Sequence, residues 1–174
     1  GGMAVHKSVA DKWKELTGFP LLVAYGLTET SPAACCNRLD IDGHNGSIGL
    51  PMSSTEIMII DDEGNELGID EVGELCIRGP QVMKGYWGQE EASAESLTED
   101  GWFKTGDFAQ IDEEGYIRIV DRKKEMINVS GFNVFPSEVE EVANSHPDIY
   151  ESAAIGLPCE KTGEKVKLFV VSRD

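Results

Sequence analysis

Turn-forming residues recur at short intervals along residues 46–120, and their spacing limits this stretch to short strands. Two of the clusters, 61–65 and 112–115, combine acidic residues with a glycine, as tight turns between antiparallel strands often do. Residues 116–120 follow the second cluster as the other arm of a hairpin. The pattern predicts a small, distorted β-barrel or sandwich, with a short helix at 90–97 on its outside.

The first 45 residues have a different sequence pattern. Apolar residues recur at helical spacing ahead of Gly18, which predicts an amphipathic helix with a left-handed end; they are Val5, Val9, Trp13 and Leu16. Residues 21–25 form a short apolar run that stops at Gly26, as a buried strand of a mixed or parallel sheet does. Residues 25–30 then lie at the C-terminal end of that strand, where open α/β sheets bind ligands.

The sequence pattern of residues 121–174 predicts the start of a separate α+β unit. Residues 126–129 are a predicted strand, and Ser130-Gly131 is a turn. Ser137-x-x-Glu140 fits a capping box at the start of a helix. Two further strands, at 153–157 and 166–171, complete a βαββ-like beginning of a domain.

Charge supports a boundary before Asp121. Residues 1–120 carry 22 acidic and 8 basic side chains, whereas residues 121–174 carry 10 and 7. We therefore expect mixed α/β and β architecture in three parts: the end of an α/β sheet subdomain at 1–45, a β-barrel subdomain at 46–120, and the start of an α+β domain at 121–174. The net charge of −17 repels phosphate and argues against nucleic acid as a partner.

Metal and disulfide chemistry have little support in the sequence. The four cysteines form no C-x-x-C pair, which favours reduced thiols and a cytoplasmic location. The acidic cluster at 61–63 lacks the spaced oxygen ligands of a calcium loop and reads as a solvated turn. No apolar run is long enough for a membrane span, so membrane contact, if any, is peripheral.

Residues 25–30 offer an aromatic ring, two hydroxyls and a carboxylate at one strand end. A ring can stack on a base, hydroxyls can bond phosphate oxygens, and a carboxylate can hold Mg²⁺. Taken alone, the same residues also suit an ordinary strand-end turn, so both interpretations stay open at this point.

This motif is the first of several sequence blocks that occur in a fixed order. The blocks are Tyr25-Gly26-Leu27-Thr28-Glu29, Gly73-Glu74-Leu75, Gly85-Tyr86-Trp87, Gly101-Trp102-Phe103-Lys104-Thr105-Gly106-Asp107, Asp121-Arg122-Lys123-Lys124 and residues 130–140. The set resembles the adenylate-forming (AMP-binding) superfamily over nearly the whole chain. Within it, the residues at 46–51, 79–83 and 121–140 are most similar to bacterial long-chain fatty-acid CoA ligases.

The resemblance implies a nucleotide site in the first two parts. Tyr25 and Gly26 would contact adenine, Thr28 would touch the nucleotide phosphate, and Glu29 would help to hold Mg²⁺. Asp107 would accept hydrogen bonds from the ribose hydroxyls. An isolated Thr-Gly-Asp is otherwise a strand-to-turn cap.

The resemblance also assigns roles after residue 120. Arg122 would contact the ribose or the reacting groups, and Asp121 would be the hinge about which a C-terminal lid swings between two half-reactions. Gly131 would leave room for the pantetheine arm of CoA. The alternatives are a solvated basic turn for Arg122 and a plain turn glycine for Gly131.

The implied activity is ATP-dependent formation of an acyl-adenylate from a fatty acid, followed by transfer of the acyl group to CoA. Two family parts, a phosphate loop and a lysine in the C-terminal domain, lie outside residues 1–174, so we expect a fragment that is inactive alone. The alternatives are an adenylation domain that loads a carrier protein and a non-catalytic nucleotide-binding module.

Overall fold

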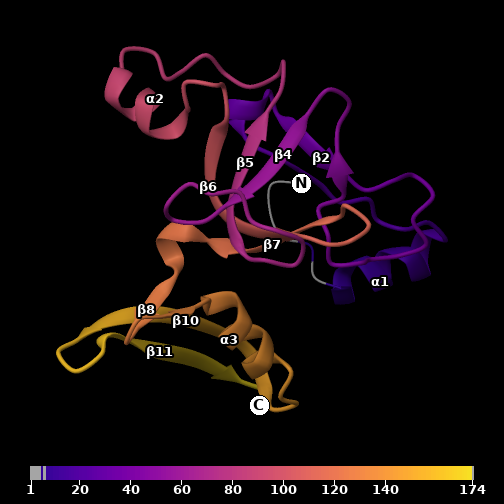
Figure 1. Ribbon diagram of the computed structural model, residues 1–174. Helices are drawn as coiled ribbons and strands as arrows, with labels where there is room; N and C mark the ends of the chain where they lie inside the picture. The colour runs from indigo at the N-terminus through magenta and orange to yellow at the C-terminus, as the bar shows by residue number, and fades with distance from the viewer. Residues whose placement is uncertain (1–4, 6, 174) are drawn as a thin grey trace. The chain divides into compact units, whose positions relative to one another are not determined.

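The computed structural model describes residue 5 and residues 7–173. They form two compact units: residues 5 and 7–105 with 109–119, and residues 106–108 with 120–173. None of the helices in these described ranges is long and apolar enough to cross a membrane. The mixed α/β fold class predicted from the sequence is confirmed, whereas the boundaries of the three predicted parts remain a prediction (Figure 1).

The elements up to Arg122 are mainly strands, with two short helices and one 3-10 turn. They are α1 (Lys7–Thr17), β1 (Ala24–Gly26), η1 (Thr28–Thr30), β2 (Ala33–Cys36), β3 (Leu50–Pro51), β4 (Glu56–Ile60), β5 (Gly73–Arg78), α2 (Glu90–Ser96), β6 (Phe103–Ile111) and β7 (Ile117–Arg122).

Helix α1 and its predicted end are confirmed. Gly18 has φ of +75° and its N–H donates to the Lys14 carbonyl oxygen at 2.8 Å, as a left-handed helix stop does. The apolar stripe of α1 is nevertheless exposed at Val9, Trp13 and Leu16, and Ala10 is its buried residue. The helix is therefore held to the first unit by less apolar surface than the stripe suggests.

The predicted strand at 21–25 is shorter than expected and has a different partner. Only residues 24–26 pair, and they pair antiparallel with β2, with Tyr25 opposite Cys35. The three-stranded sheet has the order β1-β2-β3. The expectation of a buried strand in a mixed or parallel sheet is wrong for this segment, because an apolar run does not specify its strand partner.

Four strands form a second sheet in the order β4-β5-β6-β7. Strand β5 is buried on both faces, and Leu75, Cys76 and Ile77 are fully enclosed. The core of the first unit gathers on this strand together with Ala34, Cys35, Ile59, Ala109 and Ile117. The predicted hairpin of β6 and β7 is present, but among the described residues the strands form an open sheet rather than a closed barrel.

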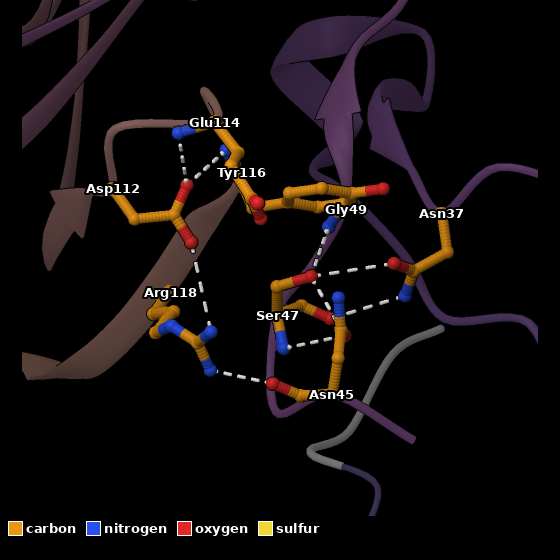
Figure 2. A network of polar contacts seen from close by, with 8 residues as sticks. All are labelled: Asn37, Asn45, Ser47, Gly49, Asp112, Glu114, Tyr116 and Arg118. Atoms are coloured by element: carbon orange, nitrogen blue, oxygen red, sulfur yellow. Dashed lines mark hydrogen bonds and ion pairs between the residues drawn. The ribbon is translucent and has the colours of Figure 1, made fainter. Parts of the chain in front are cut away.

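A polar network holds the loop that precedes β3 to this hairpin (Figure 2). Arg118 donates to the Asn45 carbonyl oxygen and forms an ion pair with Asp112 at 3.6 Å. Ser47, which is buried, bonds Asn45 and the buried Asn37 through its hydroxyl. Asp112 also accepts the N–H groups of Glu114 and Tyr116. The carboxylate of Asp112 thus fixes the turn at 112–115, to which it belongs.

The second unit contains η2 (Lys123–Glu125), β8 (Ile127–Val129), β9 (Phe132–Val134), α3 (Pro136–Asn144), β10 (Ile149–Cys159) and β11 (Gly163–Ser172). Its sheet has the order β10-β11-β8-β9, and α3 lies against β10 (Figure 1). The sequence pattern predicted three of these strands. The additional strand is β9, which pairs with β8 directly across the Ser130-Gly131 turn.

The predicted capping box at the start of α3 is wrong. The Ser137 hydroxyl donates to the Val120 carbonyl oxygen at 2.8 Å, and the Glu140 carboxylate accepts the Ala154 N–H at 2.8 Å. The Ser137 N–H instead donates a hydrogen bond to Asp121 Oδ2 at 3.0 Å. Tertiary partners have displaced the local pairing that the spacing suggests.

Candidate functional site

Residues 27–30 form a tight polar turn at the end of β1, where the sequence predicted the nucleotide motif. The buried Thr30 organises this turn: its Oγ1 accepts the Leu27 N–H at 2.9 Å and donates to the Pro32 carbonyl oxygen at 2.7 Å. The N–H of Thr30 itself donates to the Leu27 carbonyl oxygen. The sequence analysis counted Thr30 only as a hydroxyl that could bond phosphate, although a hydroxyl residue at the end of a 3-10 turn is a known source of such local bonds.

Gly26 is required by a close backbone approach. A Cβ atom at this position would lie 1.6 Å from the Pro32 carbonyl oxygen. Any side chain here would therefore separate residue 26 from the segment that follows the turn. The glycine lets the chain double back so that Thr28 and Glu29 project from a short loop.

The predicted site residues of the first unit occupy different environments. Tyr25 is half-buried and packs against the core cluster. Thr28 is exposed, and the structure records no hydrogen bond for its side chain among the described residues. Glu29 is half-buried and its Oε1 accepts one hydrogen bond. The turn thus presents one hydroxyl and one carboxylate beside an aromatic ring.

The partner of Glu29 is Tyr86, which the sequence motifs did not assign to the site. The Tyr86 hydroxyl donates to Glu29 Oε1 at 2.9 Å, across 57 positions of sequence. Burial first, and then the hydrogen bond to Glu29, raises the pKa of Tyr86, so its phenol is a protonated donor at neutral pH. The one sequence feature that pointed to Tyr86 as a site residue was its place in the Gly85-Tyr86-Trp87 block.

Asp107 lies in β6 and belongs to the second compact unit with Gly106. Gly106 has φ of +73°, and an added Cβ would meet nothing within 4 Å. The requirement for glycine is therefore conformational rather than steric. Asp107 is half-buried, and the preceding Thr105 donates its hydroxyl to the Leu75 carbonyl oxygen at 2.8 Å.

The three later predicted residues are also in the second unit. Asp121 accepts the Arg122 N–H through Oδ1 at 2.8 Å in addition to its bond with Ser137. The Arg122 side chain is exposed and lies 3.7 Å from Glu125 Oε1. Gly131 has φ of +86° and its N–H donates to Asn128 Oδ1 at 2.9 Å, as a turn glycine does. The roles of all three toward a ligand remain predictions.

The turn suits a divalent cation that also binds phosphate. Within residue 5 and residues 7–173, no group of three or more His, Cys, Asp and Glu side chains could enclose a metal. Mg²⁺ usually takes one or two carboxylates and completes its octahedron with substrate phosphates and water. Glu29 fits that use because the structure records no hydrogen bond to its Oε2 from the residues it describes.

Comparisons with known proteins match the chain along its length. The profile of the AMP-binding enzyme family covers residues 1–87, and that of the AMP-binding enzyme C-terminal domain covers residues 138–174. A long-chain-fatty-acid–CoA ligase from Escherichia coli is 55% identical over 174 residues, which are 100% of this chain and 31% of the ligase.

Two solved structures have the same fold. ATP-bound MatB from Rhodopseudomonas palustris is 36% identical with a TM-score of 0.89, and the match covers 96% of this chain and 33% of MatB. The o-succinylbenzoate CoA synthetase of Bacillus subtilis, in complex with its acyl-adenylate intermediate, is 34% identical with a TM-score of 0.87. That match covers 100% of this chain and 36% of the synthetase.

Proposed function

Because the chain belongs to the AMP-binding enzyme family, we propose that it is part of an ATP-dependent long-chain fatty acyl-CoA ligase. The observation that carries this proposal is the 55% identity over 174 residues with the Escherichia coli ligase. The chain spans 31% of that relative, so the activity belongs to a longer parent protein. The parent acts on a fatty acid, ATP and CoA in the cytoplasm, with any membrane contact peripheral.

The reaction has two steps. A free carboxylate is a poor electrophile, so the fatty acid first attacks the α-phosphorus of ATP, which forms the acyl-adenylate and releases pyrophosphate. The CoA thiol then attacks the acyl carbonyl carbon, its proton is lost to solvent or a base, and AMP leaves. Each step builds negative charge on phosphate oxygens, and fixed donors and cations near these oxygens lower the barrier.

The turn at 27–30 supports the first step. Thr30 makes the bonds that hold the turn, so the exposed Thr28 hydroxyl is available to donate to a phosphate oxygen. Glu29 would hold Mg²⁺ through Oε2, and the bound cation would offset the charge of the triphosphate. Tyr25 and Gly26 would lie at the adenine, with the ring offering a stacking face.

The second unit supplies the remaining proposed contacts. Asp107 accepts hydrogen bonds from the ribose hydroxyls, which are charge-assisted and therefore strong. Arg122 contacts the ribose or the reacting groups, and Asp121 is the hinge between the two half-reactions. Gly131 would leave room for the pantetheine arm of CoA.

A thioester assay of the full-length parent across fatty acids of increasing length tests this function. The ligase is expected to give fatty-acid-dependent pyrophosphate exchange and then acyl-CoA, with the highest kcat/KM for long chains. Acyl-adenylate without acyl-CoA would favour an enzyme that loads a carrier protein. Absence of both products with intact ATP binding would favour a non-catalytic module.

We also propose that residues 1–174 do not catalyse alone. The family pattern includes a phosphate loop and a lysine that this stretch does not contain, and both would contribute to adenylation. Purified residues 1–174 are expected to show no pyrophosphate exchange above background. Exchange that rises in proportion to the concentration of this polypeptide would overturn the proposal.

A further inference from the structure

The hydrogen bond between Tyr86 and Glu29 joins the polar turn to a loop that no proposed ligand contact uses. The donor and acceptor lie 2.9 Å apart, and both side chains are half-buried in the first unit. A second bond ties the same two segments, since the Met83 N–H donates to the Glu29 carbonyl oxygen at 2.8 Å. Both the backbone and the carboxylate of Glu29 are therefore held by residues 83–86.

The backbone of Tyr86 is also held in place. Its N–H donates to Ser93 Oγ at 2.8 Å, and Ser93 Oγ donates in turn to the Gln89 carbonyl oxygen at 2.7 Å. Helix α2, which contains Ser93, is thereby hydrogen-bonded to the backbone of Tyr86.

A glutamate side chain has three rotatable bonds, and an untethered carboxylate would lose that freedom on binding a cation. The bond from Tyr86 removes much of this freedom in advance, and it occupies Oε1 only. A hydrogen bond from a neighbouring side chain orients a metal-ligating carboxylate and tunes its affinity for the metal.

From this geometry we propose that Tyr86 is a positioning residue for Glu29: it fixes the carboxylate so that Oε2 faces the cation of the ATP–metal complex. The proposal deepens the proposed function and rests on the role of Glu29 given there. Tyr86 touches neither substrate nor cation.

The experiment compares Tyr86→Phe with Tyr150→Phe in the full-length parent. Tyr86→Phe keeps the ring and removes the donor, whereas Tyr150 is exposed in the second unit and serves as the matched control. The first measurement is the affinity of manganese(II) for the enzyme in the presence of ATP, followed by electron paramagnetic resonance. The second is the Mg²⁺ concentration that half-activates pyrophosphate exchange, measured together with KM for the fatty acid.

Tyr86→Phe is expected to weaken manganese(II) binding by roughly 10-fold, the low end for residues that hydrogen-bond a metal ligand, because Glu29 is only half-buried. The half-activating Mg²⁺ concentration should rise in parallel, with KM for the fatty acid unchanged. Tyr150→Phe should match the unsubstituted enzyme.

Two results would overturn the proposal. One is unchanged manganese(II) affinity in Tyr86→Phe; the other is an equal loss of metal affinity and fatty-acid affinity with a lower melting temperature, which would mark a purely structural hydroxyl. Glu29→Gln separates this failure from that of the proposed function. If Glu29→Gln weakens manganese(II) binding and Tyr86→Phe does not, the positioning role fails alone; if Glu29→Gln has no effect, the metal role of Glu29 fails first.

Discussion

The side chain of Asp121 accepts a hydrogen bond from the backbone N–H of Ser137, with 3.0 Å between Oδ2 and N. Ser137 is the second residue of α3, and its N–H is one of the donors that a helix cannot satisfy internally. The other oxygen of Asp121 accepts the Arg122 N–H. One carboxylate therefore joins the end of β7 to the start of α3.

Replacement of Asp121 by alanine should loosen the first turn of α3. Loss of a capping carboxylate costs about 1 kcal/mol, which corresponds to roughly fivefold faster amide exchange where exchange occurs by local opening. Hydrogen exchange of the α3 amides in the full-length parent measures this directly. Glu151→Ala, which removes an exposed carboxylate from β10, should leave those amides unchanged. Equal exchange in the two variants would show that Asp121 does not cap the helix.

The elements that depend on local sequence were predicted well. Helix α1 ends at Gly18, α2 begins at Glu90, and the hairpin of β6 and β7 turns at 112–115, because glycine geometry and short-range bonds decide each of them. The polar turn at 27–30 was also placed correctly at a strand end.

Contacts between distant segments were not predictable in the same way. Asp121 replaced the expected capping box because Ser137 and Glu140 found tertiary partners at Val120 and Ala154. The bond from Tyr86 to Glu29 spans 57 positions and has no periodic signature in the sequence. The ligand contacts of Asp107, Arg122 and Gly131 remain predictions from the family resemblance.

Replacement of Gly26 by alanine should disrupt the polar turn. The new Cβ would lie 1.6 Å from the Pro32 carbonyl oxygen, so the backbone has to move, at a cost of about 3 kcal/mol or more. Gly43→Ala is the matched control, because its Cβ would meet nothing within 4 Å. Urea unfolding followed by tryptophan fluorescence compares the two variants. A Gly26→Ala protein as stable as Gly43→Ala would contradict the close approach.

The thiols should differ in reactivity. Burial, and next the neighbouring Cys36, raises the pKa of Cys35 to about 12, so this thiol is neutral and enclosed at pH 8. A hydrogen bond from Thr162 is the first cause of a lowered pKa at Cys159, so more of that thiol is ionised, and the thiolate is the nucleophile. Iodoacetamide at pH 8 should therefore modify Cys159 well before Cys35, as peptide mass spectrometry would record.

Two controls separate ionisation from accessibility in that experiment. In denaturant the burial of Cys35 is lost, so the two cysteines should react at similar rates. Thr162→Val should slow the modification of Cys159 in the folded protein and leave that of Cys35 unchanged. Faster modification of Cys35 than of Cys159 in the folded protein would contradict the burial of Cys35.

Asp107→Ala in the full-length parent should raise KM for ATP. If the carboxylate accepts hydrogen bonds from the ribose, its loss costs about 2 to 3 kcal/mol, or roughly 30- to 150-fold in kcat/KM for ATP. Glu113→Ala removes an exposed carboxylate from the hairpin turn at 112–115 and should leave the kinetics unchanged. Because Gly106 has φ of +73°, the backbone around Asp107 is set by the glycine, so Asp107→Ala should fold normally. A near-normal KM for ATP with full catalytic activity would remove Asp107 from the nucleotide site.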